Sequence, residues 1–162
     1  MKFRIANIAD VPAVLEIYNE HILAGNSTMD RIPKEIDEIE GWFKGFNDRE
    51  LVVLLEDGKR LIGWGIIKRY SDRIGYAMAC ETAVYLKGSE LRKGYGTLIK
   101  EWIITKCREL EYHHLVAKIF SINSASIEYN RRLGYEMVGT QREIGYVDGQ
   151  WQDVTIMQLI LD

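Results

Sequence analysis

A carboxylate and a basic, glycine-containing loop lie close together in the middle of this 162-residue sequence. Glu81 is the only charged residue of the run Tyr76–Leu86, which has the composition of a β-strand. A polar turn follows, and then Leu91–Thr97 (LRKGYGT) opens an amphipathic helix. Unpaired N–H groups at a helix N-terminus suit a phosphate, and glycine lets the backbone approach a ligand closely. The sequence therefore predicts a site that holds a phosphorylated cofactor beside a carboxylate.

Two common phosphate-binding motifs do not match this loop. The dinucleotide motif G-x-G-x-x-G/A needs a small residue where Ile99 stands, and the chain contains no P-loop ending in G-K-[ST]. The third interpretation is the acetyl-coenzyme A loop of the GNAT acetyltransferases, with the pattern Arg/Gln-x-x-Gly-x-Gly/Ala. Leu91–Gly96 resembles it, except that Leu91 replaces the Arg or Gln. A helix that simply has a glycine in its first turn is the alternative.

Other segments extend the resemblance over essentially the whole chain. Asn123–Ile127 (NSASI) and the later Leu133–Tyr135 (LGY) are similar to the N-x-x-S … G-F/Y segment of the family. Val84–Leu86 is similar to the strand that pairs with the pantetheine arm. On further short motifs, the chain is identified as a member of the phosphinothricin and methionine-sulfone acetyltransferase branch; these motifs are Ile17–Asn19, Thr28–Asp30, Gly149–Asp153 and Met157–Leu159.

Composition favours an ordinary globular enzyme and excludes several other classes. The chain is 47% hydrophobic and 28% charged, and its net charge is 21 − 24 = −3, so we expect one domain over residues 1–162 and no nucleic-acid partner. Its longest stretches without Asp, Glu, Lys or Arg are only nine residues long, which predicts no membrane helix. The start has no apolar signal region, so we expect a cytoplasmic protein. Two cysteines and three histidines without ligand spacing predict no metal site.

The periodicity of apolar residues predicts seven strands and four helices. Asp-Gly pairs at residues 57–58 and 148–149, each between two apolar runs, predict hairpins. The order is β-α-α-β-β-β-α-β-α-β-β, an α/β (α+β) chain with a mostly antiparallel mixed sheet, which matches the GNAT acyl-CoA N-acyltransferase fold. The expected strands are 3–6, 51–55, 61–68, 74–86, 115–120, 135–146 and 150–161, and the expected helices are 11–24, 33–43, 96–110 and 124–133.

The resemblance assigns the loop to the pyrophosphate of acetyl-CoA, with backbone N–H groups as donors and two basic side chains adding charge. Leu91 cannot supply the side-chain contact that the family uses. Asn123 is expected either to contact the cofactor through its amide or to cap the following helix, and both roles are compatible. The cofactor residues assigned in this way are Val84, Tyr85, Leu86, Leu91, Arg92, Lys93, Gly94, Tyr95, Gly96, Thr97, Asn123 and Ser126.

Acetyl transfer to an amine needs a base, an oxyanion donor and a route for the thiolate to leave. Glu81 is the expected base, because partial burial would raise its pKa toward the working pH; a surface or salt-bridged Glu is the alternative. The oxyanion donor implied by the resemblance is the N–H of Val84 or Tyr85. Relatives commonly have His or Tyr where Asn130 stands. Asn has no titratable proton, so we expect Asn130 at most to hydrogen-bond the sulfur.

The substrate residues are predicted least directly. Relatives that act on amino-acid analogues meet a carboxylate with an Arg where this chain has Ser71. Arg73 could take that role, or it could be a solvated charge. Thr28, Tyr70 and Trp151 are expected to line the amine pocket. The leading hypothesis is an acetyl-CoA-dependent N-acetyltransferase acting on a small amine of the amino-acid or amino-acid-analogue class. An acetyl-CoA-binding module with little turnover and a protein N-terminal acetyltransferase are the alternatives. The resemblance also implies a homodimer.

Overall fold

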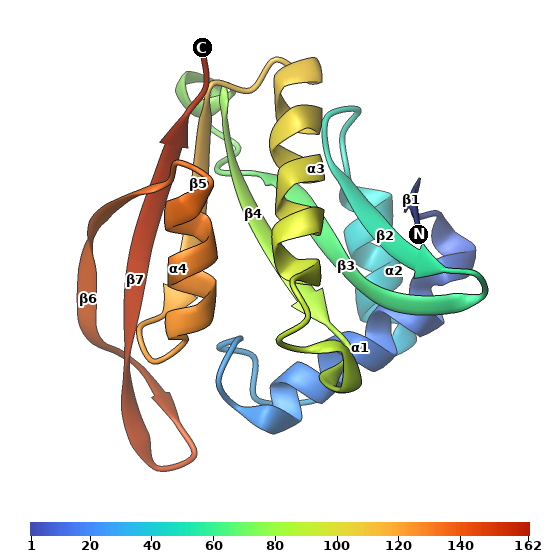
Figure 1. Cartoon of the computed structure of the whole chain (residues 1–162), viewed down its shortest axis with the longest axis horizontal. Helices are drawn as coiled ribbons and strands as arrows, with labels where there is room; N and C mark the ends of the chain where they lie inside the picture. The colour runs from blue at the N-terminus through green and yellow to red at the C-terminus, as the bar shows by residue number, and fades with distance from the viewer.

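The chain forms a seven-stranded sheet with helices on both of its faces, as Figure 1 shows for the computed structural model of residues 1–162. The predicted order of elements and the predicted mixed sheet are confirmed. The strands are β1 (Lys2–Ile5), β2 (Leu51–Asp57), β3 (Arg60–Arg69), β4 (Ala79–Leu86), β5 (His114–Phe120), β6 (Glu136–Val147) and β7 (Gln150–Ile160). The helices are α1 (Val11–Ala24), α2 (Ile36–Gly45), α3 (Tyr95–Glu109) and α4 (Ser124–Arg132).

The sheet opens between its two central strands. Its strand order is β1-β2-β3-β4-β5-β7-β6, and β4–β5 is the only parallel pair. Strand β4 pairs with β3 from Cys80 to Leu86, but with β5 only from Ala79 to Glu81. Beyond Glu81 the two strands separate, and Figure 1 shows them diverging toward the end of the molecule where α3 begins. We refer to this gap between β4 and β5 as the sheet opening.

Each face of the sheet has its own apolar core. On one face, α3 and α4 close a cluster of 18 buried residues. Helix α3 lies very near β3 there, because a Cβ on Gly65 would meet side-chain carbons of Ile99 and Ile103 at 2.8 and 2.6 Å. On the other face, α1 and α2 close a cluster of 10 buried residues around Trp64, whose indole N–H donates to the Val14 carbonyl at 3.2 Å. Residues that alternate along β4 therefore face two different helix pairs.

The segment before β4 differs from the prediction. Residues 74–86 were expected to form one strand, but Ile74–Tyr76 is a short 3₁₀ turn and β4 begins only at Ala79. The reason is the lack of a partner: β3 ends at Arg69, which pairs with Cys80, so residues 71–78 form the connection between the two strands. Helix α2 also begins later than Pro33, at a capping box formed by Glu35 and Glu38. No helix is both long and apolar enough to cross a membrane.

Candidate active site

Glu81 lies on β4 at the point where the sheet opening begins. Its carboxylate contacts the ammonium groups of Lys118 on β5, at 3.1 Å, and Lys68 on β3, at 3.6 Å. The side chain of Glu81 is 20% exposed, whereas both lysines are about half exposed. The contacts of Glu81 are therefore those of the salt-bridged alternative. Because it is reachable from solvent, this carboxylate can also accept a proton from a ligand.

The backbone N–H of Val84 on β4 points into the sheet opening. At the two ends of this strand the Lys87 N–H donates to Ile62 and the Ala79 carbonyl accepts from Tyr70, so the odd-numbered residues point their polar groups toward β3. The N–H of Val84 therefore points toward the side that β5 has left. Of the two predicted oxyanion donors, Val84 has a free N–H and Tyr85 does not, because the Tyr85 N–H faces β3.

The loop before α3 presents a row of unpaired donors. The backbone N–H groups of residues 92–97 donate none of the protein's backbone hydrogen bonds, and Leu98 is the first residue to bond back, to the Gly94 carbonyl. Gly94 has φ = 86° and Arg92 has φ = 63°, so two left-handed residues curl the loop around these donors. At Gly96 the constraint is space rather than backbone conformation, because a Cβ there would meet the Tyr129 ring of α4 at 3.2 Å.

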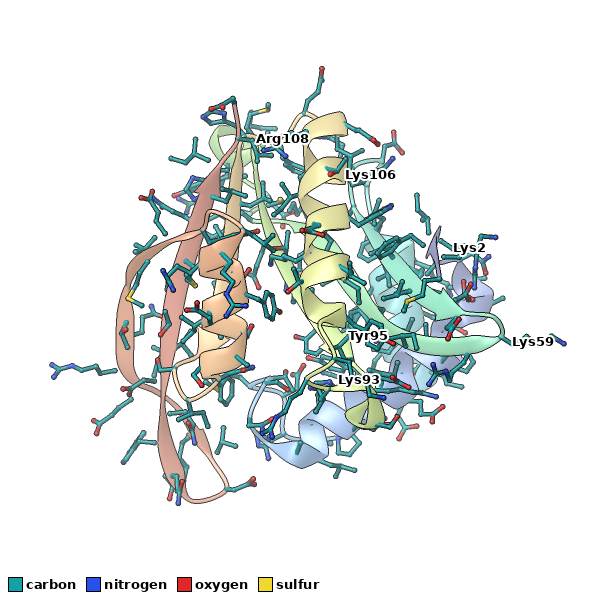
Figure 2. All side chains as sticks on the ribbon, viewed as in Figure 1. Lys2, Lys59, Lys93, Tyr95, Lys106 and Arg108 are labelled. Carbon is teal, nitrogen blue, oxygen red and sulfur yellow. The ribbon has the colours of Figure 1, made fainter.

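A buried carboxylate fixes the base of the same loop. The Glu90 side chain is only 4% exposed, and it accepts hydrogen bonds from Arg60 at the start of β3 and from Lys93, the latter at 3.2 Å. Figure 2 shows Lys93 and Tyr95 together at the N-terminal end of α3. The charge of Lys93 is therefore partly compensated within the protein. Arg92 is exposed and forms no ion pair, which leaves it as the uncompensated cation of the loop. Leu91 is also exposed.

Helix α4 places three predicted residues along the other side of the sheet opening. Asn123 caps the helix, since its Oδ1 accepts from the Ser126 N–H at 3.2 Å, so the capping role is present. Asn130 is 1% exposed, and its Nδ2 donates to the Ser126 carbonyl at 2.8 Å. The Oδ1 atom of Asn130 is buried without any partner. An orphaned acceptor of this kind indicates a place where a ligand supplies a donor.

A buried lysine that the sequence analysis missed lies on the same side. Lys100 of α3 is 2% exposed, and its Nζ donates to Thr82 Oγ1 on β4 at 2.7 Å. The ammonium also lies over the Tyr135 ring, 4.9 Å from its centroid, and no carboxylate lies within ion-pair distance. Burial lowers the pKa of Lys100 to about 8. A signal was present in the sequence, because Lys100 lies on the same helical stripe as Gly96, Ile103 and Cys107.

A cavity of about 570 Å³ lies on the α1–α2 face and meets the sheet opening at Glu81. Its walls are aromatic, and its charged groups are balanced in sign. The lining includes Tyr18, Trp42, Phe46, Trp64 and Tyr85, together with three acidic residues (Asp30, Glu50, Glu81) and three basic ones (Lys34, Lys68, Arg69). The Tyr18 hydroxyl donates to Asp30, and burial raises the pKa of that hydroxyl. We refer to this cavity as the acceptor pocket.

The predicted substrate residues are not all brought together. Thr28 is buried beside the acceptor pocket, where its hydroxyl bonds to that of Tyr18 at 2.9 Å. Tyr70 lines a second cavity, on the other side of Lys118, and packs edge-on against Tyr76. Arg73 is exposed in the connection before β4 and forms no ion pair. Trp151 is 63% exposed in the β6–β7 hairpin, against Tyr146, and lines neither cavity.

The comparisons with known proteins agree with this geometry. The family model described as the acetyltransferase (GNAT) domain matches residues 3–156. The chain belongs to the GNAT acetyltransferases. The predicted family is thus confirmed. An L-methionine sulfoximine/L-methionine sulfone acetyltransferase from Pseudomonas paraeruginosa is 31% identical to this acetyltransferase, over 98% of this chain and 94% of the relative.

Two solved structures are similar over the whole chain. A protein from Salmonella typhimurium, described as an acetyltransferase and solved with its cofactor acetyl-CoA, has a TM-score of 0.95 and 28% identity, covering 100% of this chain and 94% of its own. A ribosomal-protein-alanine N-acetyltransferase from Brucella melitensis also has a TM-score of 0.95 and 28% identity, covering 99% and 100%.

The residues of this acetyltransferase fit acetyl-CoA. The unpaired N–H groups of residues 92–97 form a cradle for a pyrophosphate, and Arg92 adds a positive charge. The sheet opening leads from that cradle, and is lined on one side by Val84 and on the other by Asn123 and Asn130. The orphaned Asn130 Oδ1 lies along the same path. When bound, acetyl-CoA supplies an acyl carbon attached to a good leaving group.

Proposed function

We propose that this acetyltransferase moves the acetyl group of acetyl-CoA to the primary amine of an amino acid or a close analogue, of the phosphinothricin or methionine-sulfone type, by direct attack of the amine. The observation that supports this most is the position of Glu81. Its carboxylate lies where the acceptor pocket meets the sheet opening, so it borders both the amine side and the cofactor side. An amine in the pocket and a thioester in the opening would meet beside it.

Two of the steps then have a residue of this chain to perform them. The substrate arrives as an ammonium, and Glu81 accepts the proton that must leave before the nitrogen can attack. The Val84 N–H points into the opening and donates to the oxygen on which negative charge develops, a contact worth about 3 kcal/mol when it is well aimed. The aromatic walls of the acceptor pocket displace water from the reacting groups.

The charge pattern of the acceptor pocket supports an amino-acid substrate. A zwitterion has one positive and one negative group, and the pocket offers three acidic and three basic side chains around an aromatic wall. The relative from Pseudomonas paraeruginosa is named for two methionine derivatives, which are zwitterions with an apolar stem. Arg73 is an uncompensated cation outside the pocket lining, and it stays a candidate for the substrate carboxylate.

A protein N-terminus is the second candidate acceptor. The solved structure from Brucella melitensis bears the name of a ribosomal-protein-alanine N-acetyltransferase and is 28% identical. A peptide has no free carboxylate next to its reacting amine, whereas the acceptor pocket contains three cations, each paired with one of its three acidic residues, that a substrate carboxylate can also contact. This balance favours the free amino acid. The third alternative, a binding module with little turnover, is supported by Leu91 and by Asn130, which replace the Arg/Gln and the His/Tyr of relatives.

The first experiment is release of CoA thiol from acetyl-CoA across a panel of amines: methionine sulfone, methionine sulfoximine, phosphinothricin, ordinary amino acids, polyamines and an Ala-start peptide. We expect release with the sulfone or phosphinothricin group. Release with the peptide alone would move the substrate to protein N-termini. If no amine of the panel leads to CoA release while acetyl-CoA still binds in calorimetry, the binding module would be favoured.

We also propose that the protein acts as a cytoplasmic homodimer with its C-terminal hairpin near the interface. Strand β6 is an edge strand of the sheet, and it exposes a row of large apolar side chains. Met137, Val138, Ile144 and Tyr146 are each 57 to 60% exposed. Long apolar edges of this kind are covered in most soluble proteins.

A further inference from the structure

We propose that Lys100 is the proton donor to the departing thiolate, a role that Asn130 cannot perform. The proposal rests on the acetyl transfer proposed above and adds a catalytic residue to it. Lys100 lines the same cavity as Val84 and Asn130, on the α3–α4 side of the sheet opening. Nothing else in the chain requires a lysine at this buried position, because its only polar contact is a neutral hydroxyl.

The two faces of the sheet separate the two proton transfers. Glu81 and Tyr85 point toward α1 and α2, where the acceptor pocket lies. Thr82 points the other way and holds Lys100 Nζ at 2.7 Å. The cavity at the sheet opening is lined from both faces, since it includes Tyr85 and Lys118 as well as Lys100 and Asn130. A base on the amine side and an acid on the sulfur side therefore flank one passage.

The hydrogen bonding of Lys100 leaves it free to donate. An ammonium has three N–H donors, and the structure provides one acceptor, Thr82 Oγ1, together with the face of the Tyr135 ring. In the same cavity, Asn130 Oδ1 is an acceptor without a donor. A thiolate can accept from the first group, and the thiol that forms can donate to the second. The two unsatisfied groups thus match the two protonation states of one sulfur atom.

The protons balance without any further reactant. The substrate nitrogen loses two protons, one before it attacks and one as the adduct collapses to the amide, and Glu81 passes each of them to solvent. The bond between the acyl carbon and sulfur breaks and its electron pair stays on sulfur, which takes a proton from Lys100 Nζ. The neutral amine of Lys100 then recovers one proton from solvent, so the whole reaction releases one proton. Burial lowers the pKa of Lys100 to about 8, and a free thiol has a pKa of about 8.5, so the donor and acceptor are closely matched.

The surroundings of Lys100 define what a pH measurement would report. The titratable and charged groups that face it from the packed elements are Cys80 and Glu81 of β4, Cys107 of α3, Lys118 of β5, Tyr129 of α4 and Tyr135. The hydrogen bond with Cys107, together with burial, raises the pKa of Cys80, and burial raises the pKa values of Tyr129 and Tyr135. Lys100 is thus the group here whose pKa is shifted to about 8. If it is the acid, kcat falls as pH rises through that value.

The direct test needs no amine and no turnover. CoA is bound to wild type and to Lys100→Met, and its thiol is titrated by the ultraviolet absorbance of the thiolate. An ammonium beside the sulfur should lower the apparent pKa of the bound thiol by about one unit or more relative to the variant. An opposite charge at close range shifts the pKa of an ionisable group by about that amount. Equal values in the two proteins would overturn the proposal, even if wild type proved to be a good acetyltransferase.

Kinetics provide the second readout. With acetyl-CoA and an amine that proved to be a substrate in the panel, Lys100→Met should have a kcat lower by about tenfold or more. The decrease of kcat with rising pH should disappear, while the affinity for CoA stays the same. Lys106→Met is the matched control, since Lys106 lies on the same helix at the opposite end from Lys93 (Figure 2) and pairs with Glu109. An unchanged kcat in Lys100→Met would contradict the proposal.

A second substitution keeps the test valid if Lys100→Met does not fold. Lys100→Arg retains the positive charge, but a guanidinium does not release its proton at these pH values. It should keep the lowered pKa of the bound thiol and still lose kcat. A merely structural lysine would give the opposite result, with kcat retained by the charged replacement.

Discussion

At the scale of single residues, the proposed chemistry depends most on Glu81, the only acidic side chain on the strand that borders the sheet opening. Glu81→Gln keeps the shape but accepts no proton, so we expect kcat/KM to fall by about 100-fold or more. Binding of acetyl-CoA, measured by calorimetry, should be unchanged. Lys68 and Lys118 are about half exposed, so losing their partner should cost little stability.

The matched control is Glu128→Gln. Glu128 is also ion-paired, with Arg131 and Arg132, but it lies on the outer side of α4, away from both cavities. Its substitution should leave kcat/KM as it is. Full activity in Glu81→Gln would show that the carboxylate does not act as the base.

A second prediction concerns Asn130. Histidine at this position can donate a proton, so Asn130→His should preserve or raise turnover, and it should restore part of the kcat lost in Lys100→Met. The measurement is kcat of the single and double variants at one pH. A large loss in Asn130→His with the fold intact would contradict the position given to Asn130 beside the departing sulfur.

Of the ionisable groups at the site, Glu81 was predictable from the sequence and Lys100 was not, for a physical reason. Glu81 stood out because it was the one charge in an apolar strand, and the glycines marked the loop. Lys100 was overlooked because a lysine in a helix is usually solvated. In the structure Lys100 is only 2% exposed, whereas the apolar Leu98 of the same helix is 41% exposed. The stripe through Ile99, Ile103 and Cys107 was a better guide than residue type.

At the scale of elements, short-range signals predicted the hairpins and long-range pairing decided the rest. Asp148 and Gly149 have φ values of 50° and 77°, the two left-handed residues that a tight hairpin turn needs, so the Asp-Gly signal was sufficient there. The boundary of β4 was not predictable from its own residues, because it depends on where β3 and β5 run out of partners. The sheet opening is likewise a property of pairing rather than of local sequence.

Two glycines at the start of α3 give a prediction at this scale: Gly94 caps the helix and Gly96 lies in its first turn. Gly94→Ala should destabilise the protein by about 1 kcal/mol or more, because φ = 86° is strained for any residue with a Cβ, and it should weaken acetyl-CoA binding. Gly96→Ala should also weaken binding, since its Cβ would push Tyr129 and thus α4 away from α3. Thermal unfolding and calorimetry on both variants test this.

Gly41→Ala is the control for this pair. Gly41 lies inside α2 with nothing within 4 Å of an added Cβ, so alanine should raise stability by up to about 1 kcal/mol. Its affinity for acetyl-CoA should not change. Wild-type affinity in both Gly94→Ala and Gly96→Ala would mean that the cofactor does not use this loop.

At the scale of the whole molecule, the sheet separates two binding regions and leaves one edge uncovered. Helices α3 and α4 border the cofactor side, α1 and α2 border the acceptor side, and β1 and β6 are the two outer strands. Strand β1 is only four residues long, whereas β6 has twelve, most of them exposed. Such a long apolar edge would favour pairing with another chain unless something covers it.

The resulting prediction is that a second copy of the chain covers this edge. Light scattering after gel filtration should give twice the 18.8 kDa mass of the chain. Ile144→Asp places a charge in the middle of β6, where the side chain is 58% exposed, so it should leave the monomer folded and shift the mass to 18.8 kDa. Ile8→Asp is the control, because Ile8 is 48% exposed beside β1, outside the C-terminal hairpin. The Ile8→Asp variant should remain a dimer. A wild-type mass of 18.8 kDa would rule out the dimer and leave β6 as an edge that the monomer tolerates.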